Sequence, residues 1–481
     1  MKKDMKKMIY GMMVAAALTL SACDSWLDVE PKTNVDEDQL YQREQGFKEA
    51  LTGVYIKMCD ATLYGRELTY GFMDQIAQRY VNSQNQNADY GQPTWYTYPS
   101  TKTEGYTNAF WAGSYNLIAN LNNLLQRIDK DGANIRTAGL KEIIRGEAIA
   151  LRSFLYFDLL RMFGPIYSQH AASPSIPYRT QFNSKETKLL PASAVIDSVI
   201  ADLRRAEISL EADSMSISFP TTGTDGNSFL SNRFNRMNKY AVKAELARVY
   251  QWKGDKANAL KYALEVIDAR RSNGSAIFTL VTDNAQDRLF STELIFALNM
   301  DAETFPDQVT NDFELASWNY YVLMDVNRLY QIFDTAVDGL NDIRIRDGVA
   351  FNISSSSAVT LKYGQDNLKS PALKNTMPLI RLAEMYYIAA ESAPDLAMAA
   401  RYLNAIRAAR GLDDVTLSSE GDRLAQLEKE YRKEFYAEGQ IWYFYKRNAY
   451  KTFLNCPVAS MTEANYRFAV PDDEVLLGNV Y

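Results

Sequence analysis

The chain has 481 residues, with 52 Lys and Arg against 59 Asp and Glu, and a formal net charge of −7 at pH 7. An acidic chain without a basic run argues against nucleic acid as a partner and against electrostatic binding to anionic lipid. His170 is the single histidine, whereas a zinc site takes three or four His, Cys or carboxylate ligands. The sequence therefore predicts no metal site and no cofactor, and it argues against a metallohydrolase.

Residues 1–22 have the pattern of an export signal. Four lysines at the start are followed by an apolar run over 9–20 and by the small residues Ser21 and Ala22, as a signal peptidase requires. The apolar run is about a dozen residues long, whereas a helix needs about 20 to cross the hydrocarbon core. We therefore expect a cleaved signal peptide rather than a membrane span.

The residues at the end of this signal resemble the lipobox of bacterial lipoproteins. The sequence there is Leu20-Ser21-Ala22-Cys23, and in a lipobox the cysteine is lipidated and becomes the mature N-terminus. The alternative is an ordinary cleavage site with a chance cysteine. We expect Cys23 to carry several acyl chains, which would make a permanent anchor because each buried methylene contributes about 0.8 kcal/mol. The mature chain, 23–481, would then carry a formal charge of −10, since four Lys and one Asp are removed.

The mature chain is predicted to be one all-α domain, because apolar and small residues recur at spacings of three and four. Short strands are predicted near 277–281, 293–298 and 358–363. The predicted helices cover residues 45–59, 111–128, 140–163, 192–210, 237–252, 256–271, 377–390, 395–410 and 423–438.

Several of these helices form pairs of the tetratricopeptide type. Residues 238–269 contain a helix rich in Ala, Leu and Tyr, a break at Gly254, and a second Ala-rich helix. Residues 380–411 repeat the pattern, and 111–163 form a looser third copy. Small residues allow two helices to approach closely, and a glycine-containing turn reverses the chain. The spacing between the copies is irregular, so we expect a few helical hairpins with long loop insertions rather than a regular solenoid.

Three insertions differ in composition from the helices. Residues 79–110 are rich in Asn, Gln, Thr, Gly and Tyr with few aliphatic side chains, and we expect no core helix there. Residues 212–236 are rich in Ser, Thr and Gly, and 299–320 mix acidic with aromatic residues. Long irregular insertions on a regular frame are commonly either functional or disordered.

Several motifs follow one another along the mature chain. They are CDSWLDVEP, GEAIALRSFLYFDLLRMFG, NKYAVKAELARVY, RLAEMYYIAAES, LNAIRAARGL, EYRKEFYAEGQIWYFYKR and VPDDEVLLGN. Together, in this order, they resemble the SusD/RagB family of outer-membrane nutrient-binding lipoproteins, and the resemblance covers nearly the whole chain. The sequence departs from the family at Ile441, where members usually carry Arg, and at Phe444, where they often carry Asp. The closing P-x-x-E pattern is present at Pro471 to Glu474 but has different neighbours.

The resemblance implies a helical, lipid-anchored protein at the cell surface that caps a TonB-dependent transporter of the SusC type. Such a protein delivers oligosaccharides, or in some members peptides, to the transporter and is not an enzyme. The chain also lacks a GxSxG elbow and a GxxxxGK[ST] loop. A third possibility is a structural subunit that seals the transporter without contacting substrate.

Candidate ligand-binding residues come from the polar, aromatic insertions. A sugar ring has an apolar face and a rim of hydroxyls, so flat aromatic side chains beside amides or Arg suit it. The alternative is that these aromatic residues contact the transporter or cover the scaffold, as Trp111 is expected to pack on its own helix. The candidates are Arg79, Asn82, Trp95, Tyr96, Tyr98, Asn108, Trp318, Tyr320 and Tyr321, with Asn85, Tyr90 and Asn319 as further members.

Other prominent side chains are predicted to be structural. They lie on helices at core-facing spacing, where we expect packing and buried ion pairs: Arg152, Tyr156, Tyr250, Glu384, Glu434 and Trp442. Export would permit a disulfide between Cys59 and Cys456, but nothing in the sequence shows that they meet. We expect two thiols that pack as small apolar groups.

Overall fold

The computed structural model describes residues 37–80, 90–213, 229–313, 324–364 and 373–477. Cys23 and the predicted signal peptide lie outside these ranges. A large hydrophobic core contains residues from Tyr41 to Phe468, so the two ends of the described chain pack into the same interior.

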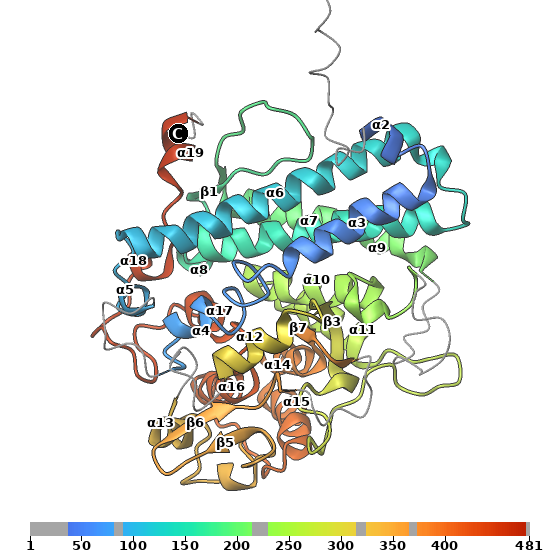
Figure 1. Ribbon diagram of the computed structural model, residues 1–481. Coiled ribbons are helices and arrows are strands. Elements are labelled where there is room, and N and C mark those ends of the chain that lie inside the picture. Colours follow the sequence, from blue (N-terminus) through green and yellow to red (C-terminus); the bar gives the residue numbers. More distant parts are fainter. Residues whose placement is uncertain (1–36, 81–89, 214–228, 314–323, 365–372, 478–481) are drawn as a thin grey trace, which may run out of the picture.

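The fold is built on helices that pack on one another in chain order, as the all-α prediction requires. Helix α6 packs on α7, α7 on α9, α9 on α10 and α10 on α11, while α3 lies against α6 (Figure 1). These helices are α3 (Glu44–Met58), α6 (Thr101–Asp131), α7 (Leu140–Phe163), α9 (Ala192–Ser209), α10 (Lys239–Lys253) and α11 (Lys256–Ile267).

Two stacked helical hairpins confirm the tetratricopeptide-like prediction. In the first, Gly254 ends α10 at φ +83°, a left-handed conformation that favours glycine, and the Asp255 side chain accepts from the backbone N–H of Asn258 at 3.1 Å to begin α11. The second hairpin consists of α14 (Leu382–Ser392) and α15 (Leu396–Ala409), where Asp395 caps α15 in the same way. Because α11 packs on α14, the two hairpins are stacked.

Strands occupy a small part of the fold. Strand β3 (Leu294–Asn299) pairs antiparallel with β7 (Thr376–Arg381), a second sheet has the order β4-β6-β5, and β1 pairs with β2. The remaining bounds are β1 (Pro174–Ile176), β2 (Leu190–Pro191), β4 (Met324–Asp325), β5 (Phe351–Ile353) and β6 (Ser357–Thr360).

Three secondary-structure predictions are wrong, and the first is the absence of a helix before residue 111, since α6 begins at Thr101. The predicted helix over 377–390 begins as β7 and becomes helical only at Leu382. A fully buried apolar run gives the same hydrophobic pattern whether it is a strand or a helix, so periodicity could not separate the two. The strand expected at 277–281 does not form, and only an isolated bridge between Arg270 and Ala276 lies beside it. The strands expected near 293–298 and 358–363 correspond to β3 and β6.

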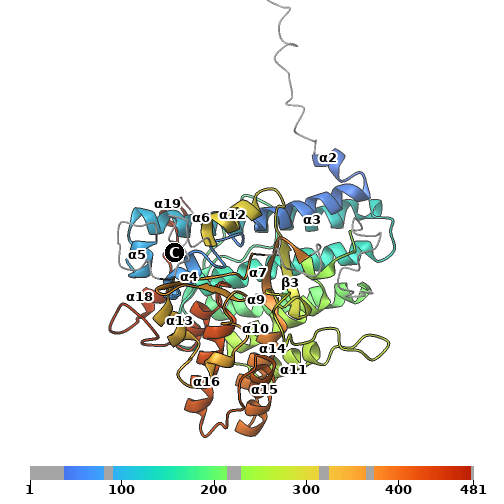
Figure 2. The same cartoon turned by 60° about the horizontal axis from the view of Figure 1, so that its bottom comes forward.

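Short helices connect and cover this frame. Three of them, α4, α5 and α18, lie side by side in Figures 1 and 2 at the end of the molecule where α6 begins. The short helices and α16 are α2 (Glu37–Leu40), α4 (Phe72–Ile76), α5 (Gly91–Thr94), α8 (Tyr167–His170), α12 (Phe305–Phe313), α13 (Val326–Ile332), α16 (Glu420–Glu434), α17 (Ile441–Arg447), α18 (Glu463–Tyr466) and α19 (Asp472–Leu477).

The residues predicted to be structural are buried, as expected. Arg152 is paired with Asp202 at 2.6 Å, and Glu384 accepts two hydrogen bonds from Arg248 at 2.6 and 2.7 Å. Tyr156, Tyr250 and Trp442 are each at most 4% exposed. Cys59 and Cys456 are free thiols rather than a disulfide.

A buried ion-pair cluster surrounds Glu434 at the end of α16. Its carboxylate oxygens accept from Arg381 at 2.6 Å, from Arg410 at 2.8 Å and from Arg344 at 2.8 Å. Burial raises the pKa of Glu434, but the guanidinium groups of Arg410, Arg381 and Arg344 outweigh burial and hold that pKa well below its usual value. The cluster therefore joins β7, the end of α15 and the residues around Arg344 to α16.

Replacing Glu434 by Gln should lower the free energy of unfolding by about 3–5 kcal/mol at pH 7. The substitution removes the one buried carboxylate that Arg344, Arg381 and Arg410 share, although each of them keeps another carboxylate partner. A depressed folded-state pKa contributes stability above the usual glutamate pKa of about 4.3 and loses it as the pH falls through the folded value. The difference between wild type and variant should be constant from about pH 5 to 8 and shrink below about pH 4. Urea denaturation across this range measures it.

The matched control is Glu420→Gln at the start of the same helix, where the Glu420 carboxylate is paired with Arg423 but is 66% exposed. An exposed pair contributes about 1 kcal/mol at most. Equal losses for Glu420→Gln and Glu434→Gln would contradict a special role for the cluster.

Candidate ligand-binding site

The ends of the two aromatic insertions lie next to each other. Within the first insertion, 79–110, the described chain stops at Tyr80 and resumes at Tyr90; at the second, 299–320, it stops at Phe313 and resumes at Met324. Arg328, four residues beyond Met324, donates from its guanidinium to the backbone carbonyl of Tyr80 at 2.5 Å. The start of the first insertion is thus tied directly to the end of the second.

Residues 65–72 form a platform that contacts described residues of both insertions. The Tyr70 hydroxyl donates to Asp312 at 2.8 Å, and the Tyr70 ring lies 4.7 Å from the Phe313 ring. Gln308 on α12 donates to the Gly65 carbonyl at 2.9 Å. These contacts hold the start of the second insertion against the platform.

The same platform holds the end of the first insertion. The Tyr90 hydroxyl donates to both carboxylate oxygens of Glu67, at 2.9 and 3.0 Å. Burial raises the pKa of Glu67, against the opposing charge of Arg66. The two insertions, far apart in the sequence, are therefore fixed to one short segment of the fold.

Three predicted ligand residues lie in the interior, so the prediction that they project from a free loop is wrong. Arg79 is 2% exposed, donates to the Arg432 carbonyl and lies 4.9 Å from the Tyr436 ring centroid. Tyr96 is stacked on Trp442 with centroids 5.6 Å apart. Tyr98 donates to the Asn465 carbonyl at 2.6 Å. These three side chains therefore hold the first insertion against the segment that contains α16, α17 and α18.

The other candidates have different surroundings. The Trp95 side chain is 37% exposed and lies within the first insertion. Gln78 donates to the carbonyl of the preceding Thr94 at 2.8 Å, which joins this part of the insertion to the residues before it. Asn108 is exposed on α6, which begins at Thr101 rather than at 111, so the expected loop over 101–110 is helix. Tyr90 is buried. Asn82, Asn85, Trp318, Asn319, Tyr320 and Tyr321 lie outside the described residues.

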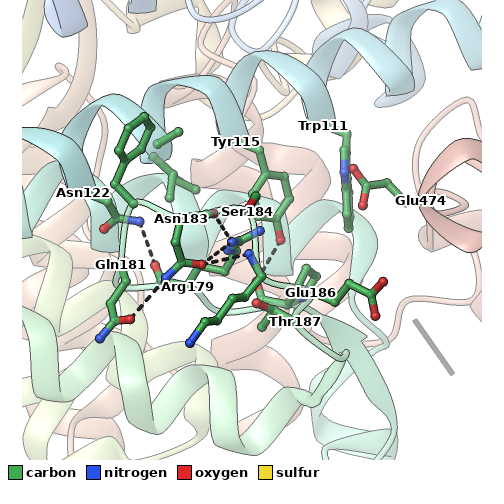
Figure 3. Close-up of a pocket in the computed structure, with 15 residues that line it drawn as sticks. Trp111, Tyr115, Asn122, Arg179, Gln181, Asn183, Ser184, Glu186, Thr187 and Glu474 are labelled. Carbon is green, nitrogen blue, oxygen red and sulfur yellow. Dashed lines mark hydrogen bonds between the residues drawn. The ribbon is translucent and has the colours of Figure 1, made fainter. Parts of the chain in front are cut away.

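A cavity that was not predicted from the sequence lies between α6 and residues 177–187. It has a volume of about 300 Å³ and is lined by one face of α6, by this loop, and by Glu474 of α19 (Figure 3). We call it the arch cavity, after the 177–187 loop that stands above α6 in Figure 1. Trp111, expected only to pack, is buried and also forms part of its wall.

Comparison with known proteins identifies the family. The family model described as starch-binding and associating with the outer membrane matches residues 25–251. The SusD family model matches residues 351–472. The chain belongs to the SusD/RagB family. SusD family proteins are sugar-binding proteins associated with the outer membrane, and none of the helices in the described ranges is long and apolar enough to cross a membrane.

Solved structures of the SusD superfamily have the same fold. A SusD superfamily protein from Bacteroides thetaiotaomicron superposes with a TM-score of 0.68 at 21% identity, over 91% of this chain and 98% of that one. A SusD-like carbohydrate binding protein from Bacteroides vulgatus gives a TM-score of 0.63 at 18% identity, over 91% and 97%.

A curated relative, SusD-like protein P38 of Formosa agariphila, is 25% identical over 224 residues. That match covers 46% of this chain and 40% of the relative.

Two neighbouring aromatic residues should respond to truncation in opposite ways. Tyr96→Ala should lower the free energy of unfolding by about 3–5 kcal/mol, because it removes a buried ring from its stack on Trp442. Trp95→Ala should cost about 1 kcal/mol or less, because that side chain is partly exposed. Urea denaturation of both variants measures the difference, and similar losses would contradict the burial described above.

Proposed function

We propose that this protein is a lipid-anchored outer-membrane protein that binds nutrient oligosaccharides at the cell surface and passes them to a SusC-like TonB-dependent transporter. The observation that carries the proposal is the attachment of two polar, aromatic insertions to one platform, residues 65–72, with Trp95 partly exposed in the first of them. Membership of a family of sugar-binding outer-membrane proteins supports the class of ligand.

The chemistry of the insertions suits capture without catalysis. Aromatic rings present a large contact area at little cost in conformational entropy, and amides beside them hydrogen-bond sugar hydroxyls. We expect weak binding, because a ligand held too tightly would not be released to the transporter. Hydrolysis of a glycan panel by the pure protein would contradict the proposed role.

Peptide capture is the alternative ligand class, because the Asn- and Gln-rich first insertion would also suit a peptide backbone. A structural subunit that seals the transporter would bind neither. Isothermal titration of the wild-type protein with glycan pools and with peptide pools separates the three roles, because each role predicts a different binding heat. The proposed function predicts heat with glycans alone. Heat with peptides alone, or with neither, would overturn the proposal.

Trp95→Ala should weaken glycan binding at least tenfold. The substitution removes an aromatic surface on which a sugar ring can stack, and a loss of about 1.4 kcal/mol in binding free energy corresponds to a factor of ten in affinity. Isothermal titration measures the affinity. Tyr402→Ala is the control, because Tyr402 is a partly exposed ring on α15 rather than beside the insertions. Unchanged affinity in Trp95→Ala would remove this residue from the site.

Cys23→Ser should release the exported protein from the membrane fraction, because serine lacks the thiol to which the anchoring acyl chains would be attached. Cell fractionation and intact-mass analysis of the mature protein measure the anchor. A variant that stays in the membrane fraction would show that Cys23 is not the attachment site.

A further inference from the structure

We propose that the arch cavity is a second carbohydrate-binding site, which takes one or two sugar units and is separate from the site beside Trp95. The inference rests on the proposed function for its class of ligand, but its location comes from different residues. Trp111 on the cavity wall is ten residues beyond the start of α6, which corresponds to about 15 Å along the helix axis.

The base of the loop that covers the cavity is fixed to the helical frame. Tyr115 donates to the Pro177 carbonyl at 2.8 Å, and Asn122 donates to the Arg179 carbonyl at 3.1 Å. The Tyr156 hydroxyl donates to the same carbonyl at 2.8 Å and accepts from the backbone N–H of Arg179. The cavity is therefore largely formed before a ligand arrives, which reduces the entropy lost on binding.

The far side of the loop is also held in place. The Arg179 guanidinium donates to the Asn183 side-chain oxygen at 3.0 Å, and the Asn183 amide donates to Gln181 at 3.2 Å (Figure 3). The Arg179 guanidinium therefore binds within its own loop, and this contact helps to define the shape of the cavity.

The cavity wall contains an indole ring and a carboxylate. Trp111 lines the cavity but is only 3% exposed, and its indole N–H is covered, so a sugar would contact the edge of the ring rather than this donor. Glu474 also lines the cavity (Figure 3), and its carboxylate is a strong acceptor for sugar hydroxyls.

An apolar surface lies beside these polar groups. Phe182 at the edge of the cavity is 49% exposed, and Tyr115 lines the α6 side. An exposed ring together with hydroxyl, amide and carboxylate groups matches a sugar, which has one apolar face and a polar rim.

Size and charge narrow the ligand class. Two basic side chains, Arg179 and Lys185, and two acidic ones, Glu186 and Glu474, line the cavity, so their formal charges cancel and a neutral ligand is favoured. A volume of about 300 Å³ is at the small end of ligand pockets, which suits one or two sugar units rather than a long chain.

Fluorine NMR of the purified full-length protein labelled with 5-fluorotryptophan can follow both sites in one sample. Trp111→Phe and Trp95→Phe assign the two signals, and the probes are neutral mono- and disaccharides with the matching amino sugars and uronic acids. We expect a neutral sugar to shift the Trp111 signal, and Phe182→Ala to weaken that response about tenfold while the Trp95 response is unchanged.

Val337→Ala is the control, because it removes methyl groups from a side chain that is 80% exposed and lies outside the cavity wall. If sugars shift the Trp95 signal alone, the second site is refuted and the proposed function stands. If no sugar shifts either signal, the second site is refuted, and the isothermal titration with glycan pools decides the proposed function separately. A Trp111 response that Phe182→Ala leaves unchanged, or one given only by charged sugars, would overturn the site as described.

Discussion

The position of the ligand-binding region depends on the buried ion pairs between the Glu434 carboxylate and three arginines. Three guanidinium groups, from Arg344, Arg381 and Arg410, converge on it in the interior. A carboxylate and several guanidiniums removed from water are favourable only when each is paired and hydrogen-bonded, so the segments that carry them have little freedom to move independently. Four segments distant in sequence are thereby held at one point.

This constraint extends to the first aromatic insertion through the four residues that follow α16. Arg381 also binds Glu438 at 2.8 Å, and Lys362 donates to the Tyr436 carbonyl at 2.8 Å. The Tyr436 ring in turn contacts the Arg79 guanidinium and lies 5.8 Å from the Tyr80 ring, immediately before the insertion begins. The ion-pair cluster thus positions the insertion through a continuous chain of packed side chains.

Local periodicity was sufficient to predict the frame but not the contacts of the insertions. The pattern around Gly254 predicts a hairpin because the turn and both helices are local features, and the structure contains it. Tyr96 and Tyr98 were expected at the surface because their segment lacks aliphatic residues. Their burial depends on Trp442 and Asn465, more than 300 residues away, and one sequence carries no signal for contacts at that separation. The arch cavity could not be predicted for the same reason, because residues 177–187 have the composition of an ordinary polar loop and their contacts with α6 are not local.

Two weak sites on one rigid frame would solve a difficulty that a single site has. A nutrient-binding protein must retain its ligand near the transporter and still release it, and one tight site would do the first at the expense of the second. When a chain occupies two linked sites, the second contact becomes intramolecular, so retention rises without any increase in the strength of either contact. Release then proceeds one sugar contact at a time, and each step breaks only a weak interaction. Because Trp95 follows α5 and Trp111 lies on α6 of the same frame, their separation is fixed and would select oligosaccharides long enough to reach both.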